Sequence, residues 1–534
     1  MVALRGRATV DRLRDEILGV RYREATTTFC RLVTEEKHPL KGVIKEAIAA
    51  AAPFVQVPSH LMRLPTGEMR GVNYDHTILG WRGAISLLSE IEGSKAVLPS
   101  VQAMWYVPQG LNIWEQIICE FPGHYARDGE KCDVKFPGPD HEVGRFDGPA
   151  WTAPKIYFED HAPIEGGSVE ERLTRMSWSI AEGNREEGYG LFLGLAKDPS
   201  CRDKLKEAIL FSGIIDLQDT IINRGGYQNI GHKAIRARAL VHIADYLGWE
   251  NAHELIYTVV PDLGCAPRLH GLWTEISNIC RMEIPAHASI AKRTDTPLTQ
   301  RELDQLVEAM VWGGPFDVNA AIMGFFKRGA GVLDVGDAVF VCFQRYLMDV
   351  LEHPALFNHP THALDYTNVV LTWIRDYDSP HHVKGVFMAA RFMNDTIRSN
   401  AMMPRDAKFT LESRRAHRAW ADSIAVDHML PLIKEHALAQ DAPRTCALVD
   451  SYLDRTSERR ALLDTITYAA CHWQNDPHVM RNCSSSLEEY RHNRTPRRDD
   501  IIRGYAKHQS RYIKRAQTHD CFQVYVVHFH PANA

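Results

Sequence analysis

Histidines at the start of predicted helices are the residues of this sequence best placed to do chemistry. His38, His76 and His381 each open an apolar segment of helical periodicity, and each is followed by glycine four residues later. His232 opens a similar segment, GHKAIRARALVHIADYLGW, with arginine at that place. Residues four apart share a helix face, so the glycine lets a neighbouring helix or a ligand approach the imidazole closely. Several such helices packed together can point their imidazoles into one metal site.

Carboxylates with a metal-binding spacing accompany some of these histidines. Glutamate and histidine three residues apart share a helix face and bind one metal in di-iron bundle proteins. The spacing occurs at Glu35/His38, Glu250/His253 and Glu489/His492. The candidate metal ligands are therefore His38, His76, His232, His253, His381, Glu35 and Glu250. For each histidine the ordinary alternative is a helix cap or a core residue whose ring nitrogens bond to the backbone.

Two further groups contain metal-binding residue types. The segment CHWQNDPHVMRNC (471–483) brings Cys471, His472, His478 and Cys483 close in sequence, with a helix–loop–helix junction as the alternative. The alternating segment FQVYVVHFH (522–530) predicts a short strand. On a strand, residues two apart share a face, which would place two histidines of this segment side by side. An exposed tail is the alternative interpretation.

Several well-known sites are missing from the sequence. HExxH, GxGxxG after a strand, GxxxxGK[ST] and GxSxG do not occur. A zincin, a dinucleotide or nucleotide phosphate site and an esterase nucleophile elbow are therefore not expected. A CxxCH motif is also missing, which argues against covalently attached haem.

The composition narrows the class of protein. The chain has 534 residues, of which 26 are histidine, and 62 Lys and Arg against 67 Asp and Glu give a formal net charge of −5. This mildly acidic balance offers no basic face for nucleic acid. The sequence shows no uncharged apolar stretch of about 18 residues and no signal peptide, so no membrane contact is expected. Eleven cysteines with irregular spacing argue against a disulfide framework, and the expectation is a cytoplasmic protein.

Helical periodicity dominates the chain and predicts an all-α fold. We expect a large assembly of helical hairpins, arranged as an internally duplicated bundle or as a solenoid, and a short strand at the C-terminus. Thr299 and Glu302 have the spacing of a capping box at the start of a helix. The Gly- and Pro-rich stretch 121–168 predicts a long loop or insertion. It separates helical regions at 1–120, 169–291 and 292–534.

The positions of several histidines suggest an internal duplication. His38, His60 and His76 are followed by His232, His253 and His270 after 194, 193 and 194 residues. A repeat of that length would place two similar helical units in one chain.

Three segments carry a resemblance to known proteins. GHKAIRARALVHIADYLGWENA (231–252), HPLKGVIKEAIAAA (38–51) and CHWQNDPHVMRN (471–482) resemble questin-oxidase-like, His-rich helical proteins and the helical region found beside some Rieske domains. The resemblance covers about a quarter of the chain in scattered pieces. It implies an all-α fold and redox or oxygenase chemistry, and it brings His38, His232 and His381 forward as site residues.

These observations lead to a functional hypothesis with two rivals. We expect a metal-dependent oxidoreductase or oxygenase, with non-haem iron in a His-lined site between helices and a small organic metabolite as substrate. Haem and zinc are alternative cofactors, and an oligomer is compatible with the sequence. Aromatic residues near these helices could line a substrate pocket: Trp81, Trp105, Tyr106, Trp249 and Trp273. The rivals are a non-catalytic helical scaffold or binding protein and a metal-dependent hydrolase.

Overall fold

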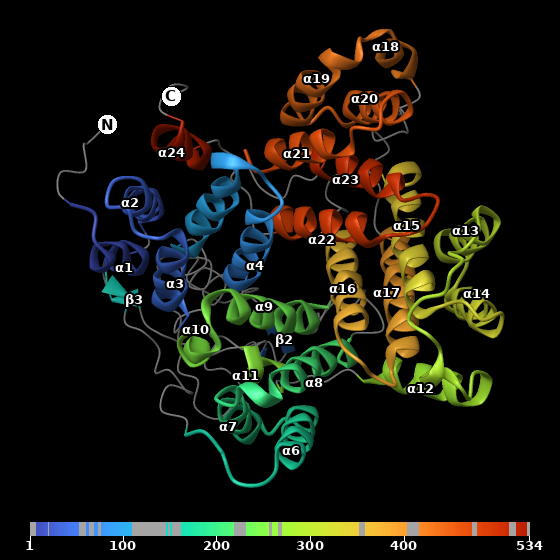
Figure 1. Cartoon of the computed structure of the whole chain (residues 1–534), viewed down its shortest axis with the longest axis horizontal. Coiled ribbons are helices and arrows are strands. Elements are labelled where there is room, and N and C mark those ends of the chain that lie inside the picture. Colours follow the sequence, from blue (N-terminus) through green and yellow to red (C-terminus); the bar gives the residue numbers. More distant parts are fainter. Residues whose placement is uncertain are drawn as a thin grey trace.

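The protein is all-α, as its periodicity predicts (Figure 1). A computed structural model describes residues 7–19, 21–52, 60–63, 69–72, 76–108, 146–147, 150–151, 162–217, 231–255, 259–264, 270–351, 358–402, 416–472, 478–511 and 520–530. Within these residues no helix is both long and apolar enough to cross a membrane. Most of the Gly- and Pro-rich stretch 121–168 lies outside them, and the predicted division into helical regions remains a prediction.

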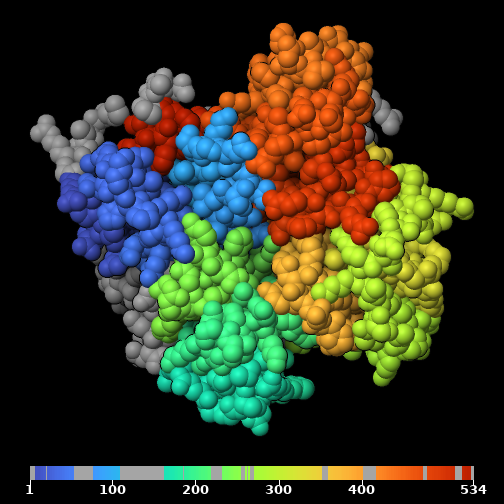
Figure 2. All heavy atoms as spheres, viewed as in Figure 1, coloured from blue at the N-terminus to red at the C-terminus, as the bar shows by residue number. Residues whose placement is uncertain are grey.

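Four helices form the centre of the molecule. They are α4 (His76–Leu88), α9 (His232–Leu247), α16 (Asn358–Asp376) and α22 (His478–His492). Helix α4 packs against α9 and α22, and α16 closes the ring by packing against the same two helices. In the space-filling view, their colours (light blue, green, orange and red) meet near the middle of the face (Figure 2).

The other helices surround this ring in four groups (Figure 1). Beside α4 lie α1 (Val10–Leu18), α2 (Tyr22–Thr34), α3 (Leu40–Ala51), a helical stretch over 98–108 and α24 (Asp520–Phe529). Below α9 lie α6 (Val169–Glu182), α7 (Arg185–Ala196), α8 (Arg202–Ile215), α10 (Ala252–Leu255) and α11 (Val259–Leu263). Beside α16 lie α12 (Gly271–Glu283), α13 (Gln300–Val307), α14 (Pro315–Lys327), α15 (Val332–Asp349) and α17 (His382–Met402). Above α22 lie α18 (Arg418–Ser423), α19 (Val426–Leu438), α20 (Ala442–Arg455), α21 (Arg459–Ala470) and α23 (Asp499–Arg511).

Short turns and hairpins complete the described elements. The 3₁₀ turns are η1 (Gly93–Val97), η2 (Pro199–Cys201), η3 (Trp249–Asn251) and η4 (His287–Ser289), and η5 (Glu308–Trp312) is a π-helical turn. Two antiparallel hairpins pair β1 (His60–Arg63) with β2 (Met69–Val72) and β3 (Phe146–Asp147) with β4 (Ala150–Trp151).

The predicted C-terminal strand is wrong. Residues 522–530 belong mostly to helix α24, whose buried side chains are Cys521, Val524 and Tyr525. Their spacing of i, i+3 and i+4 is that of a helix face. The alternation of apolar and polar residues was too short to outweigh that pattern, because α24 packs on α2 instead of pairing with another strand. His528 and His530 therefore do not share a strand face.

Helix starts follow the rules that the sequence predicts. Thr299 and Glu302 form the capping box at the start of α13, with each side chain bonded to the other residue's backbone N–H. The same arrangement joins Ser168 and Glu171 at the start of α6, which ends at Gly183 in the left-handed region. These bonds satisfy backbone donors that a helix leaves open at its first turn.

Helix α9 is buried on nearly all sides, which explains its central position. Its cations Lys233, Arg236 and Arg238 are buried together with its apolar residues. On one side α8 approaches so closely that a Cβ on Gly213 would lie 2.8 Å from the Cα of Ala234. Glycine is therefore required at this crossing, and α9 is held tightly between α8 and the ring.

Candidate metal centre

Four histidines meet where the central helices begin. His76, His232 and His478 are the first residues of α4, α9 and α22. His362 lies in the second turn of α16, near the start of that helix. We call these four residues the histidine cluster. Each of the four ring helices therefore contributes one imidazole.

Short distances join the rings of the histidine cluster. Nε2 of His362 lies 3.0 Å from Nε2 of His232 and 3.2 Å from Nε2 of His478. The ring centroid of His76 is 4.8 Å from that of His478 and 5.6 Å from that of His232. One ring nitrogen from each of His76, His232 and His362 lies within 4.8 Å of the other two.

Hydrogen bonds between the rings cannot satisfy all of these close nitrogen–nitrogen contacts. A ring nitrogen carries either one proton or one lone pair. Nε2 of His362, which faces two other Nε2 atoms, can make only one good hydrogen bond with them. A metal ion between the rings could accept lone pairs from several of these nitrogens at once, so the close approach is compatible with a metal site.

The spacing of the nitrogens is close to that of a first coordination sphere. Metal–imidazole bonds of about 2.0 to 2.1 Å place neighbouring ligand nitrogens about 2.9 to 3.4 Å apart. The two Nε2 distances of 3.0 and 3.2 Å fall within that range. The ring nitrogens of His76, His232 and His362 lie up to 4.8 Å apart, which exceeds the roughly 4.2 Å between two ligand nitrogens on opposite sides of one metal ion. A small rotation of one imidazole ring would shorten this nitrogen–nitrogen distance.

Burial favours the neutral form of His232. His232, His362 and His478 are buried. Burial, followed by the neighbouring ring of His76, holds the pKa of His232 well below its ordinary value. Only a neutral imidazole can donate a lone pair, so the ring is ready to bind a metal without first losing a proton.

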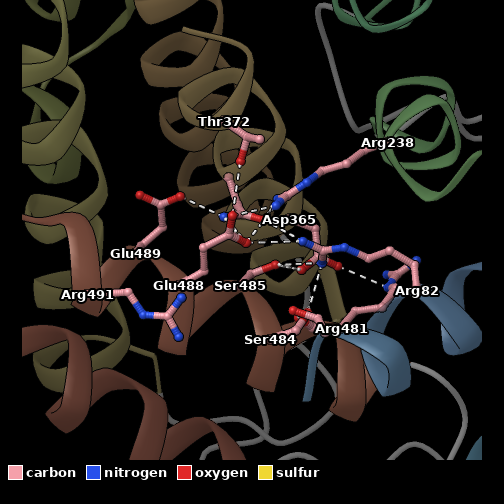
Figure 3. A network of polar contacts seen from close by, with 12 residues as sticks. Arg82, Arg238, Asp365, Thr372, Arg481, Ser484, Ser485, Glu488, Glu489 and Arg491 are labelled. Atoms are coloured by element: carbon pink, nitrogen blue, oxygen red, sulfur yellow. Dashed lines mark hydrogen bonds and ion pairs between the residues drawn. The ribbon is translucent and has the colours of Figure 1, made fainter. Parts of the chain in front are cut away.

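A buried layer of charged and polar side chains lies one to three turns further along the same helices (Figure 3). Arg82 donates to Ser484 Oγ at 2.8 Å and to Asn368 Oδ1 at 3.0 Å. Arg238 donates to both carboxylate oxygens of Glu488 at 2.6 Å and also to Asn368. These contacts join α4, α9, α16 and α22 directly below the histidine cluster.

Two further ion pairs extend this polar layer. Arg375 donates to both oxygens of Glu489 at 2.9 and 2.8 Å, a bidentate geometry. Arg481 lies 2.9 Å from Asp365, and neither side chain is exposed. We call the side chains of Arg82, Arg238, Arg375, Arg481, Asp365, Glu488 and Glu489 the charged layer.

Burial and charge compete within the charged layer. Burial, followed by the positive charge of Arg238, lowers the pKa of Arg82 to about 9. Burial opposes the charge of Glu488, but the guanidinium groups around it, that of Arg238 foremost, hold its pKa well below the ordinary range. The carboxylate is therefore ionised at neutral pH and joins α22 to the other three ring helices.

Of the predicted ligands, the structure brings His76 and His232 together. Glu35 and His38 are exposed in the segment between α2 and α3, where Glu35 pairs with Arg31 and the His38 backbone N–H donates to the Leu32 carbonyl. Among the described residues no atom lies within 4 Å of the place of a Cβ on Gly42, one turn after His38, so no described helix approaches there.

Glu250 and His253 lie together in another place. They line a cavity of about 620 Å³ with Trp249, Arg202 and Lys197. Nδ1 of His253 lies 2.7 Å from the hydroxyl of Tyr189. The Glu-x-x-His spacing at this site therefore faces a cavity that is separate from the histidine cluster.

His381 lies in an aromatic group beside α17. Its ring stacks on Phe211 at 5.2 Å and meets the edge of Trp273 at 5.6 Å. Burial, followed by the charge of Lys384, lowers its pKa to about 4. Gly385 is closely approached by Trp373 of α16, as the glycine spacing predicts.

Trp273 and Phe211 also line a second cavity, of about 330 Å³. Trp178, His270 and Asp216 complete much of its wall. Asp216 pairs with Lys233, the residue that follows His232 in α9. The first turn of α9 therefore lies between the histidine cluster and an aromatic cavity. Of the other predicted wall residues, Trp81 and Trp105 are fully buried in the core.

His362 is the cluster residue that the sequence patterns do not identify. It neither opens its helix nor precedes a glycine, so the helix-start pattern passes over it. A weaker signal was present: Arg82, Arg238 and Asn368 each follow a cluster histidine by six residues. These three side chains meet in the polar layer.

His478 stood among the candidates of the segment 471–483, but its neighbours there have other roles. The thiol of Cys483 accepts a hydrogen bond from Tyr505 at 2.9 Å. The ring of His472 stacks on Phe522 at 3.6 Å. The free thiols of Cys471 and Cys483 are hydrogen-bonded to each other. This contact, together with burial, raises the pKa of Cys471 well above its ordinary value. Cys471 is thus a protonated core residue, and Cys483 is buried beside it.

Comparison with known proteins adds no relative. No protein-family model, curated protein or solved structure matches this chain. The resemblance to questin-oxidase-like and Rieske-associated proteins therefore stays a prediction, and the functional argument depends on the geometry of the site.

Proposed function

We propose that this protein is a metal-dependent oxidoreductase that holds one divalent transition metal, iron in the first place, in the histidine cluster. The observation that carries the proposal is the approach of three Nε2 atoms, from the three helices α9, α16 and α22, at distances of 3.0 and 3.2 Å. Imidazole suits iron, copper, nickel and zinc, whereas magnesium and calcium prefer oxygen ligands. The predicted carboxylates Glu35 and Glu250 lie elsewhere, so the proposed ligand set is all-histidine.

The distances favour a single ion over haem. Histidines that hold haem iron from both sides must leave room for the flat macrocycle between their nitrogens. A separation of 3.0 Å between His232 and His362 leaves no such room. A mononuclear ion, in contrast, needs this separation between neighbouring ligands.

The protein supplies the positions and the electrostatics. An imidazole-bound divalent ion with an open position can bind dioxygen or polarise a substrate oxygen. The charged layer keeps the ring helices in register, which fixes the four imidazoles relative to one another. The aromatic cavity on the far side of α9, with Trp178, Phe211 and Trp273 in its wall, is large enough for a small organic molecule.

Nitric oxide provides a test of this proposal. The full, untagged chain would be stripped with a chelator, loaded anaerobically with ferrous iron and exposed to nitric oxide, an analogue of dioxygen. We expect a high-spin iron–nitrosyl signal in EPR spectra, absent from the double variant His232→Ala/His362→Ala and kept by the control His253→Ala. Iron that binds without a nitrosyl signal would contradict an oxidoreductase and favour a structural metal in a helical scaffold. A preference for zinc with no iron binding would favour the hydrolase.

A further inference from the structure

Arg481 is a fully buried cation whose hydrogen-bonding capacity is not used. It lies in α22 one turn after His478, so the two side chains share a helix face. Its guanidinium is 2.9 Å from Asp365 through Nε, but Nη1 and Nη2 are buried and have no hydrogen-bond partner in the part of the chain that the structure describes. Buried donors without an acceptor cost free energy, and the cost is larger for a charged group.

The charged layer has one positive charge in excess. It contains four guanidinium groups, those of Arg82, Arg238, Arg375 and Arg481, and three carboxylates, those of Asp365, Glu488 and Glu489. Each guanidinium has a carboxylate within ion-pair distance, but Glu488 is shared by Arg82, Arg238 and Arg375, so the guanidinium groups of the layer outnumber its carboxylates by one. Buried charges are normally balanced, so a further anion would be stabilised here.

The histidine cluster contains no carboxylate, and α4, α9 and α22 all begin there. The start of a helix carries a partial positive charge and open backbone donors. Helix α9 has Gly231 as its N-cap and therefore no capping side chain.

We propose that Arg481 binds the carboxylate of an anionic ligand beside the histidine cluster, with Nη1 and Nη2 each donating to one carboxylate oxygen. The planar fork of arginine matches the two oxygens of a carboxylate, and such bidentate pairs are shorter and stronger than neutral hydrogen bonds. That this ligand is the substrate of the metal centre depends on the proposed function. The anion site itself depends only on Arg481 and its surroundings.

Acetate and its neutral isostere acetamide test the anion site directly. Both would be titrated into the metal-free full chain and followed by carbon-13 NMR of the labelled probe. We expect wild type to bind acetate at least about tenfold more tightly than acetamide, because only acetate pairs with the guanidinium. Arg481→Lys should lose most of this difference, since lysine keeps the charge but lacks the fork. The matched control is Arg491→Lys on the same helix, half exposed and paired with Glu90 outside the cluster.

The outcomes separate the two proposals. Equal binding of acetate and acetamide by wild type, or equal acetate binding by Arg481→Lys and wild type, would overturn the anion site. So would inorganic phosphate that binds more tightly than acetate. If Arg481→Lys does not fold, Asp365→Asn decides: it frees the guanidinium and should strengthen acetate binding, and unchanged or weaker binding would contradict the proposal. Acetate binding that depends on Arg481 in a chain that binds no metal would refute the metal centre and leave the anion site standing.

Discussion

Nε2 of His232 and Nε2 of His362 lie 3.0 Å apart, although 130 residues separate them in the chain. Each ring is fixed by its own helix, and both helices belong to the central ring with α4 and α22. The contact is therefore a property of the whole bundle. It also makes His362 the middle residue of the cluster, because its Nε2 faces His478 on the other side.

The middle position of His362 predicts a rank order among ligand variants. His362→Gln should weaken cobalt(II) binding by at least about 100-fold, more than the 10- to 100-fold typical of residues that only support a ligand. His478→Gln should cost less, because His76, His232 and His362 still lie within 4.8 Å of one another. The measurement is a titration followed by the visible absorption of bound cobalt. His253→Gln is the control, and a larger loss for His478→Gln than for His362→Gln would contradict the assignment.

The close contact of α8 with α9 predicts that Gly213→Ala disturbs the site without changing a ligand. A Cβ at Gly213 would meet the Cα of Ala234 at 2.8 Å, so α9 must move. We expect the free energy of unfolding to fall by about 1 to 3 kcal/mol, as for other overpacked contacts. Metal affinity should fall as well, because Ala234 is two residues from His232. Gly42→Ala, where a Cβ meets nothing within 4 Å, should be neutral or stabilising by up to about 1 kcal/mol; equal destabilisation by both changes in urea unfolding would disprove the argument.

Part of the fold and part of the histidine cluster could be predicted from the sequence. The all-α class and the capping box of Thr299 and Glu302 depend on residues close together in the chain, so the sequence alone predicts them. His76 and His232 were found because both open an apolar helix. His362 could not be found in that way, because what brings it to the cluster is the packing of α16 between α9 and α22. The strand predicted over 522–530 was wrong for a similar reason, because packing against α2, which the sequence does not reveal, favours a helix there.

Loss of charge at Glu489 should reveal how strongly the charged layer holds the bundle. Glu489 is fully buried and accepts two hydrogen bonds from Arg375 and one from Asn368. Glu489→Gln leaves Arg375 without its buried partner, and we expect the free energy of unfolding to fall by about 3 to 5 kcal/mol. The comparison is Glu283→Gln, which breaks an exposed pair with Lys327 and should cost less than about 1 kcal/mol. Chemical denaturation of both variants gives the two values, and similar losses would refute a structural role for the layer.

His382 should make stability depend on pH below neutrality. Burial, followed by the charge of Lys292, lowers its pKa from 6.5 to about 4, while Asp378 opposes the shift and His381 adds to it. As pH falls through 6.5, the unfolded chain takes up a proton at His382 that the folded chain refuses until about pH 4. The free energy of unfolding therefore falls across this window, by at most about 3 kcal/mol for this residue.

The control for this pH effect is a histidine on the surface. His382→Gln should make the stability curve shallower between pH 6.5 and 4, measured by urea unfolding at several pH values. His428→Gln, which changes a side chain about three-quarters exposed, should leave the curve as it is in wild type. A slope that His382→Gln does not alter would show that other groups cause the pH dependence.

Metal content tests the central claim most directly. The full chain would be purified without a histidine tag, and its iron, zinc, copper, nickel and manganese would be measured per chain by mass spectrometry. We predict about one transition-metal ion per chain in wild type and in His253→Ala, because His253 belongs to a different cavity. His232→Ala/His362→Ala should contain almost none while keeping its helical circular dichroism. A wild type that neither carries nor takes up a stoichiometric metal, or a double variant that binds metal as wild type does, would contradict the account.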